Sequence, residues 1–217
     1  MINTVIFDLD GTLVDSLTDL GNTVNTLLKE LGYPIHSHDE YRYFVGNGVI
    51  KLIERALPQD HQEDIMELKR RFDEIYEKHC LDNTRAYPGM VDLINELVDQ
   101  EYNLAVVTNK PQDHATKIVK TLFPGCFKYV FGNSERHPKK PDPCLTNLVI
   151  SLFDVRKNEV VYLGDSDVDM ATAKNAKVKS IGVSWGFRGR QELLDNGADE
   201  VVDRAKEILE VINDWSK

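Results

Sequence analysis

The sequence predicts an α/β fold in which a parallel sheet is interrupted, after its first strand, by a block of helices. Short β-branched strands alternate with amphipathic helices from residue 87 onward. Between residues 16 and 86, by contrast, the apolar residues recur at helical spacing and no convincing strand is visible. We therefore expect an α/β core built from residues 1–15 and 87–217. Residues 16–86 should form a helical cap, with hinges near residues 14–16 and 84–89.

The first strand is predicted at residues 4–7, a β-branched and aromatic run that indicates burial. It ends at two carboxylates, Asp8 and Asp10, which Gly11 follows. Open α/β folds place their sites at the carboxyl ends of parallel strands. Carboxylates at such a position bind a metal, take part in chemistry, or both. A merely acidic strand end before a turn is the alternative that this stretch alone leaves open.

The cap should contain several helices. Leucines and valines at three- and four-residue steps predict one helix over residues 17–31. Residues 39–57 predict two short helices around the glycines at 46 and 48, and residues 59–80 predict a charged helix with one buried stripe.

The core should resume at residue 87 as alternating helices and strands, the pattern of a parallel sheet. Pro88 suits the first turn of the first of these helices. The helices are expected at residues 88–100, 112–122, 143–153 and 205–215, and the strands at residues 104–109, 129–132, 160–165, 180–183 and 200–202.

The composition is that of a globular chain of 217 residues with a net charge of −10. This charge argues against a nucleic-acid partner and against an anionic membrane surface. No apolar run approaches the ~20 residues of a membrane span, and the first residues do not resemble a secretory signal. We expect a cytoplasmic protein, monomeric or dimeric, whose three cysteines are reduced thiols. An anionic substrate would need a bound metal and a lysine to reverse the local field.

Polar groups at several strand ends have the character that phosphoryl transfer requires. Thr108 and Asn109 end one predicted strand, and Asp165 ends another. Lys140 precedes a predicted helix between them. Because the carboxyl ends of parallel strands share one edge, these groups can converge with Asp8 on one crevice. Together they supply carboxylates for Mg²⁺, a nucleophile, a hydroxyl donor and a fixed cation.

The run Asp8-x-Asp10-Gly11-Thr12-Leu13-x-Asp15-Ser16 resembles the nucleophile motif of the haloacid dehalogenase superfamily, in its phosphatase branch. The resemblance implies a Rossmann-like core with an inserted cap. It implies that Asp8 attacks phosphorus and forms an aspartyl-phosphate. Asp10 would act as general acid and base, and its backbone carbonyl would bind Mg²⁺ beside the Asp8 carboxylate.

The other motifs of that superfamily have counterparts here. Thr108 and Asn109 match the second motif and would contact the phosphate, although a Thr-Asn turn that only ends a strand is the simpler alternative. Lys140 matches the third motif and would neutralise the phosphate, although a solvated basic pair with Lys139 is the alternative. In the fourth motif, Asp165 would bind Mg²⁺ directly. Asp169 would act through water or from outside the direct ligands, and Asp167 has no assigned ligand role.

The cap segment Phe44-Val45-Gly46-Asn47-Gly48 resembles that of phosphoglycolate phosphatases. Gly46 and Gly48 would let backbone amides approach a small anion, with Asn47 between them, although a helix–helix turn also needs glycine. The resemblance implies a Mg²⁺-dependent phosphomonoester hydrolase acting on 2-phosphoglycolate. The alternatives are another small phosphomonoester or pyrophosphate, a sugar-phosphate mutase, and a binding or regulatory protein without turnover.

Overall fold

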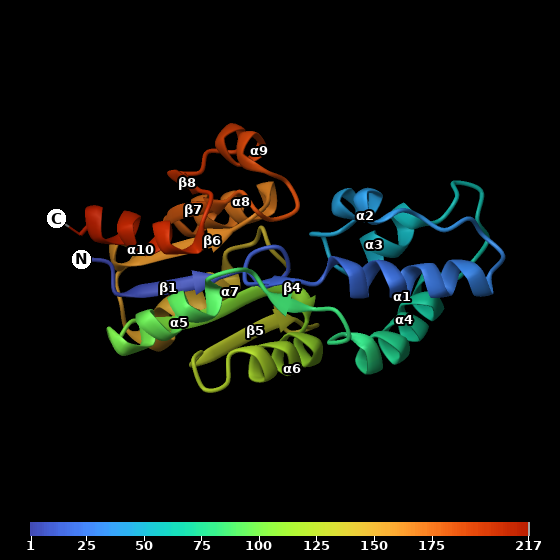
Figure 1. Cartoon of the computed structure of the whole chain (residues 1–217), viewed down its shortest axis with the longest axis horizontal. Helices are drawn as coiled ribbons and strands as arrows, with labels where there is room; N and C mark the ends of the chain where they lie inside the picture. The colour runs from blue at the N-terminus through green and yellow to red at the C-terminus, as the bar shows by residue number, and fades with distance from the viewer. Residues whose placement is uncertain (217) are drawn as a thin grey trace.

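A parallel sheet of six strands forms the centre of the molecule (Figure 1), whose computed structural model describes residues 1–216. The strand order is β5-β4-β1-β6-β7-β8. Strand β1 lies between β4 and β6, in register from Thr4 to Phe7 with both. The carboxyl ends of these three strands therefore lie side by side. The strands are β1 (Thr4–Phe7), β4 (Asn103–Pro111), β5 (Tyr129–Asn133), β6 (Val160–Gly164), β7 (Lys179–Val183) and β8 (Glu200–Val202).

Helices cover both faces of this sheet, because alternate residues of the buried strands point to opposite sides. Val5 and Phe7 of β1 pack in one apolar cluster with α5, α6 and α10, whereas Ile6 packs in another with α7 and α8. The helices of the core are α5 (Met90–Asp99), α6 (Gln112–Leu122), α7 (Cys144–Phe153), α8 (Asp167–Ala176), α9 (Arg190–Asp195) and α10 (Ala205–Asp214), with a short 3₁₀ helix, η1 (Lys157–Glu159).

Four helices between β1 and β4 form a separate group, which we call the helical block (Figure 1). They are α1 (Leu17–Glu30), α2 (His38–Phe44), α3 (Val49–Ala56) and α4 (Ile65–His79). The chain enters and leaves the block through a two-stranded antiparallel ribbon of β2 (Val14–Asp15) and β3 (Arg85–Ala86), in which Val14 pairs with Ala86. Among the residues that the structure describes, no helix combines the length and apolar character needed to cross a bilayer.

The predicted α/β class, with a parallel sheet and inserted helices, is confirmed. Four details of the prediction are wrong. The charged helix begins at Ile65 rather than at residue 59, because the Asp64 carboxylate accepts the Met66 N–H and caps it there. Pro88 lies outside the helix that follows it, since Gly89 is the N-cap. The two-residue strand β3 lies at the edge of the stretch where no strand was expected, and α9 was not predicted.

Candidate active site

Three buried carboxylates gather at the carboxyl edge of the sheet. Asp8 follows β1, Asp165 follows β6, and Asp169 lies in the first turn of α8. One oxygen from each lies within 4.8 Å of the others. The structure therefore brings together the carboxylates that the strand-end motifs singled out. Asp167, by contrast, is exposed at the start of α8.

Asp165 is held by close packing of the backbone around it. Its Oδ2 accepts the Phe187 N–H at 2.8 Å, and its Oδ1 accepts the Thr12 hydroxyl at 3.2 Å. Gly11 adopts a φ of +85°, and a β-carbon there would lie 2.3 Å from Asp165 Oδ2. Glycine after Asp10 is thus required twice, by the turn and by the neighbouring carboxylate. Burial, followed by the charges of Asp169 and Asp8, raises the pKa of Asp165 well above its usual range.

Lys140 is the buried cation of this cluster. Its Nζ lies 2.8 Å from Asp8 Oδ1 and 2.7 Å from Asp169 Oδ1. Burial alone lowers the pKa of Lys140, but the carboxylates of Asp169 and Asp8 outweigh it and raise that pKa. The lysine thus stays charged beside Asp8.

Asp169 has little room to bind a metal directly. Its Oδ2 accepts the backbone N–H groups of Asp165 and Ser166 at 3.2 and 3.1 Å, and the Ser166 hydroxyl at 2.7 Å. Its Oδ1 accepts from Lys140. Both oxygens are occupied, so the contacts of Asp169 are those of a group that positions Asp165 and Lys140.

Asp8 has fewer contacts than Asp169. Its Oδ1 is buried and lies 2.8 Å from Lys140 Nζ. Burial raises the pKa of Asp8 to about 6, Lys140 offsets part of that rise, and Asp169 adds to it. The carboxylates of Asp8 and Asp165, with oxygens within 4.8 Å of each other, fit a site for a hard divalent cation.

Asp10 lies at the side of this cluster, next to the helical block. Its Oδ1 accepts the Ser16 hydroxyl at 2.6 Å, and Lys110 Nζ lies 2.9 and 3.1 Å from its two oxygens. Lys110 Nζ also donates to the Tyr76 hydroxyl at 2.8 Å. Sequence reasoning did not single out Lys110 or Tyr76. The position of Lys110, two residues beyond Thr108 on the same strand, was a signal that could have found it.

Thr108 and Asn109 differ in their contacts. Thr108 is buried, and its hydroxyl oxygen accepts the Lys110 N–H at 3.3 Å, which leaves the hydroxyl hydrogen free to donate. The Asn109 side chain instead holds backbone groups. Its Oδ1 accepts the Lys140 N–H at 2.9 Å, and its Nδ2 donates to the carbonyls of Lys140 and Gly46, each at 3.3 Å. Asn109 therefore positions Lys140 and joins the sheet edge to the helical block.

The loop between α2 and α3 contributes to the site only in part. Gly46 and Gly48 line the cavity, both with positive φ. The Asn47 side chain, in contrast, accepts Arg55 Nη2 at 2.7 Å, and Asn47 is not among the residues that line the cavity.

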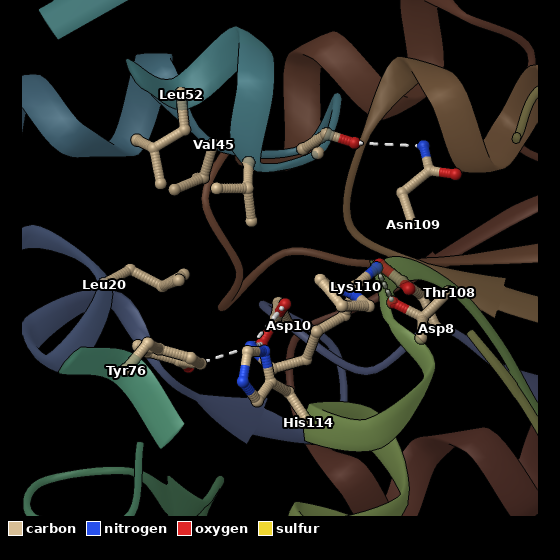
Figure 2. A pocket seen from close by; sticks show the side chains of 14 residues that line it. Asp8, Asp10, Leu20, Val45, Leu52, Tyr76, Thr108, Asn109, Lys110 and His114 are labelled. Carbon is tan, nitrogen blue, oxygen red and sulfur yellow. Dashed lines mark hydrogen bonds and ion pairs between the residues drawn. The ribbon is translucent and has the colours of Figure 1, made fainter. Parts of the chain in front are cut away.

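A small cavity lies between the sheet edge and the helical block (Figure 2). About 50 Å³ of it is open to water-sized spheres, compared with roughly 10–15 Å³ for a single water. One side is polar and the opposite side is apolar, as Figure 2 shows for Asp10 and Leu52. The lining residues are Asp8, Asp10, Leu20, Val45, Gly46, Gly48, Val49, Leu52, Tyr76, Thr108, Asn109, Lys110, Pro111 and His114.

Comparison with known proteins agrees with this geometry. The family model of haloacid dehalogenase-like hydrolases matches residues 5–183. A phosphoglycolate phosphatase of Vibrio parahaemolyticus is 34% identical over 97% of this chain and 96% of its own. Another, of Pseudomonas savastanoi, is 33% identical over 94% of this chain and 78% of its own. The crystal structure of a predicted phosphoglycolate phosphatase from Haemophilus somnus is 28% identical, with a TM-score of 0.88 and 97% of each chain covered.

The fold, the acidic cluster with its buried lysine and the family match together define the class of this protein. The chain belongs to the haloacid dehalogenase-like hydrolase family. Within that family it is a phosphatase, as its relatives over nearly the full length of the chain are.

Proposed function

We propose that this phosphatase hydrolyses small phosphomonoesters through an aspartyl-phosphate on Asp8, with Mg²⁺ as its cofactor and 2-phosphoglycolate as its substrate. The observation that carries the proposal is the buried Asp8 carboxylate. Its Oδ1 lies 2.8 Å from Lys140 Nζ, one of its oxygens lies within 4.8 Å of an Asp165 oxygen, and it shares one cavity with Asp10.

Each residue of the site has a part in this reaction. An oxygen of Asp8 attacks phosphorus, the bond from phosphorus to the ester oxygen breaks, and Asp10 gives its proton to the leaving alkoxide. Water then attacks the aspartyl-phosphate, Asp10 takes a proton from that water, and the acyl-phosphate bond breaks to free Asp8 and phosphate. Lys140 and the Thr108 hydroxyl bind the phosphate oxygens, and Asn109 positions Lys140.

Asp8, Asp165 and the backbone carbonyl of Asp10 would hold the Mg²⁺ ion, with Asp169 outside the direct ligands. When bound, the ion supplies positive charge that offsets the repulsion between a carboxylate nucleophile and a phosphate dianion. This charge also reconciles an anionic substrate with a chain of net charge −10.

The substrate is proposed from the relatives that are named phosphoglycolate phosphatase. The apolar wall of the cavity argues against a sugar-phosphate mutase, which would need hydrogen-bonding partners for sugar hydroxyls there. That wall consists of Leu20, Val45, Val49 and Leu52. Hydrolysis of pyrophosphate or of another small phosphomonoester is what the first experiment must exclude. We assign residues 16–86 to a cap that closes over the substrate, and residues 1–15 and 87–217 to the catalytic core.

The experiment that tests the proposal is phosphate release from 2-phosphoglycolate, from a panel of small phosphomonoesters and from pyrophosphate, each with Mg²⁺ and with EDTA. We expect metal-dependent release that is fastest from 2-phosphoglycolate. Faster release from another compound would discard the substrate and keep the mechanism. Absence of release from every compound would overturn the proposed reaction.

The covalent step predicts that Asp8→Asn abolishes turnover while the protein stays folded. The amide is a poor nucleophile, whereas its size and shape match those of the carboxylate it replaces. Steady-state hydrolysis should fall by at least about 10⁴-fold, in line with the loss of a catalytic nucleophile. Circular dichroism and thermal unfolding check the fold. Hydrolysis within tenfold of the unchanged protein would rule out attack by Asp8.

A further inference from the structure

One buried cation of the cavity has no part in the reaction described above. Lys110 is 5% exposed, and its ammonium contacts Asp10 and the Tyr76 hydroxyl. It also lies 4.6 Å from the centre of the Tyr76 ring. Lys140, the other lysine of the site, is committed to Asp8 and Asp169 where phosphate binds. Lys110 instead lies on the side of Asp10, where the leaving group must be.

Two further polar groups face the same corner of the cavity. The Tyr76 hydroxyl oxygen accepts from Lys110, so its own hydrogen is available, and no described residue accepts it. His114 is 6% exposed, and its Nδ1 is buried without a hydrogen-bond partner among the described residues. Its ring lies edge-on to that of Tyr76, with centroids 5.1 Å apart. Figure 2 shows Lys110, Tyr76 and His114 together beside Asp10.

Buried polar groups that lack partners are uncommon, and the unpaired Nδ1 of His114 indicates a missing ligand atom. The Lys110 ammonium already contacts Asp10 and Tyr76, so what it adds to this corner is positive charge. Together with the hydrogen of the Tyr76 hydroxyl, these groups suit a planar anion that can accept several hydrogen bonds. The remaining wall of the cavity is apolar. A neutral leaving group would leave the polar corner unmatched, whereas a carboxylate would satisfy it.

The geometry points to Lys110, together with Tyr76, as the site that recognises a carboxylate on the leaving group, two bonds from the ester oxygen. The inference rests on the proposed function and specifies the substrate class, an α-phosphorylated carboxylic acid. To protonate the ester oxygen, Asp10 must contact it, and Lys110 Nζ lies only 2.9 Å from Asp10 Oδ1. A carboxylate carried by the adjacent carbon therefore comes within reach of Lys110 and of the Tyr76 hydroxyl.

The test compares 2-phosphoglycolate with ethyl phosphate, which has the same carbon skeleton without the carboxylate. The ratio of their kcat/KM values is measured in the unchanged protein, in Lys110→Met and in Tyr76→Phe. Dividing a variant's ratio by that of the unchanged protein cancels the intrinsic reactivity of the two esters. Lys120→Met, a substitution of an exposed lysine on α6, is the matched control.

We expect the unchanged protein to prefer 2-phosphoglycolate strongly. Lys110→Met should lower the ratio roughly 10- to 100-fold and Tyr76→Phe roughly 3- to 10-fold, as loss of charged and neutral hydrogen bonds predicts. Lys120→Met should leave the ratio unchanged. Lys110→Arg should restore part of it, because the positive charge is kept.

Three results would overturn the inference. One is an unchanged protein that hydrolyses ethyl phosphate as well as 2-phosphoglycolate. Another is a variant ratio that stays constant while both rates fall, since Lys110 would then act only through Asp10. If Lys110→Met does not fold, an unchanged ratio in Tyr76→Phe decides against the inference. Failure of the unchanged protein to hydrolyse any phosphomonoester would instead refute the proposed function itself.

Discussion

At the scale of single residues, the site depends on a carboxylate kept away from water. Burial raises the pKa of Asp8 to about 6 from an ordinary value of 3.8, even with Lys140 beside it. The ionised form of Asp8 is the nucleophile. Burial away from water makes this form more reactive, but it also raises the free energy of the charged carboxylate. A bound divalent cation favours that form, because it adds positive charge next to the carboxylate.

This pKa predicts how activity responds to acid. At low Mg²⁺, kcat/KM should fall as pH drops through about 6, because Asp8 becomes protonated. Saturating Mg²⁺ should move this acid limb to lower pH, since the cation competes with the proton. The measurement is a pH profile at two Mg²⁺ concentrations. An acid limb that stays in place would show that another group controls it.

Ionisation of Asp8 changes the free energy of unfolding in the direction opposite to that of most carboxylates. Because the pKa of Asp8 is higher in the folded chain than in the unfolded one, ionisation of Asp8 destabilises the metal-free protein. Its contribution to the free energy of unfolding should therefore decrease as pH rises from about 4 to about 6. In Asp8→Asn this decrease should be absent, which urea denaturation with EDTA can measure.

The residues of the core motifs were predictable because residue type and strand-end position carry the information locally. Asp8 and Asp165 directly follow the buried strands β1 and β6. Thr108 lies near the carboxyl end of β4, which continues to Pro111. The pair of Lys110 and Tyr76 was not predictable in this way. The two residues are 34 positions apart and meet only because α4 packs over the sheet edge. Tyr76 has the pattern of an ordinary buried helix residue until the fold shows what its hydroxyl contacts.

At the scale of elements, the first turn of α1 is fixed to the chain that returns to the core. Asp19 is 2% exposed, and its carboxylate accepts the backbone N–H groups of Asn83 and Thr84, the Asn83 amide and the Thr84 hydroxyl. Burial alone raises the pKa of Asp19, but these hydrogen bonds outweigh it and lower that pKa. The contacts tie both ends of the helical block together beside the β2–β3 ribbon.

We expect Asp19→Ala to lower the free energy of unfolding by about 2–4 kcal/mol, because it leaves buried donors unpaired. Urea denaturation measures this loss, and Asp39→Ala, in the exposed first turn of α2, is the control. Since the folded pKa of Asp19 is depressed, its stabilisation is present above the unfolded pKa and is lost as pH falls. A loss equal to that of Asp39→Ala would contradict the assigned role.

Among the elements, the sequence predicted best the helices and strands in which the spacing of apolar residues repeats over many positions. The helices α1, α5, α6, α7 and α10 and the buried strands β1 and β6 have distinct periods, and they lie within two residues of where they were expected. The ribbon strands β2 and β3 have two residues each, which is too short for any alternation to show. Their pairing depends on Val14 meeting Ala86 across the whole helical block.

At the scale of the whole molecule, side chains from the loops at the carboxyl edge of the sheet hold the helical block over the cavity. Arg188, in the loop after β7, donates to the carbonyls of Arg42 and Val45 at 2.6 and 3.1 Å. Asn109 makes a second link, to Gly46. These bonds connect the core to the end of α2 and the loop after it, which form one wall of the cavity.

Arg188→Ala should therefore weaken closure of the block. We expect KM for the substrate to rise about 3- to 10-fold with a smaller change in kcat, and hydrogen exchange of residues 42–48 to become faster. Arg190→Ala, which removes an exposed ion pair with Asp203, is the matched control. Exchange at residues 42–48 that is the same in both variants would show that Arg188 does not hold the block.

The β2–β3 ribbon has a consequence for how such a protein can be altered. The chain leaves the core at Val14 and returns to it at Ala86, which lies opposite Val14 in the ribbon. For the core, everything in between is therefore equivalent to the loop of one long hairpin. The closure entropy of such a loop grows only slowly with its length. The segment between these two residues can thus be exchanged for a longer, shorter or unrelated insert. Such an insert would be joined at the same two points, and the catalytic edge of the sheet would remain in place.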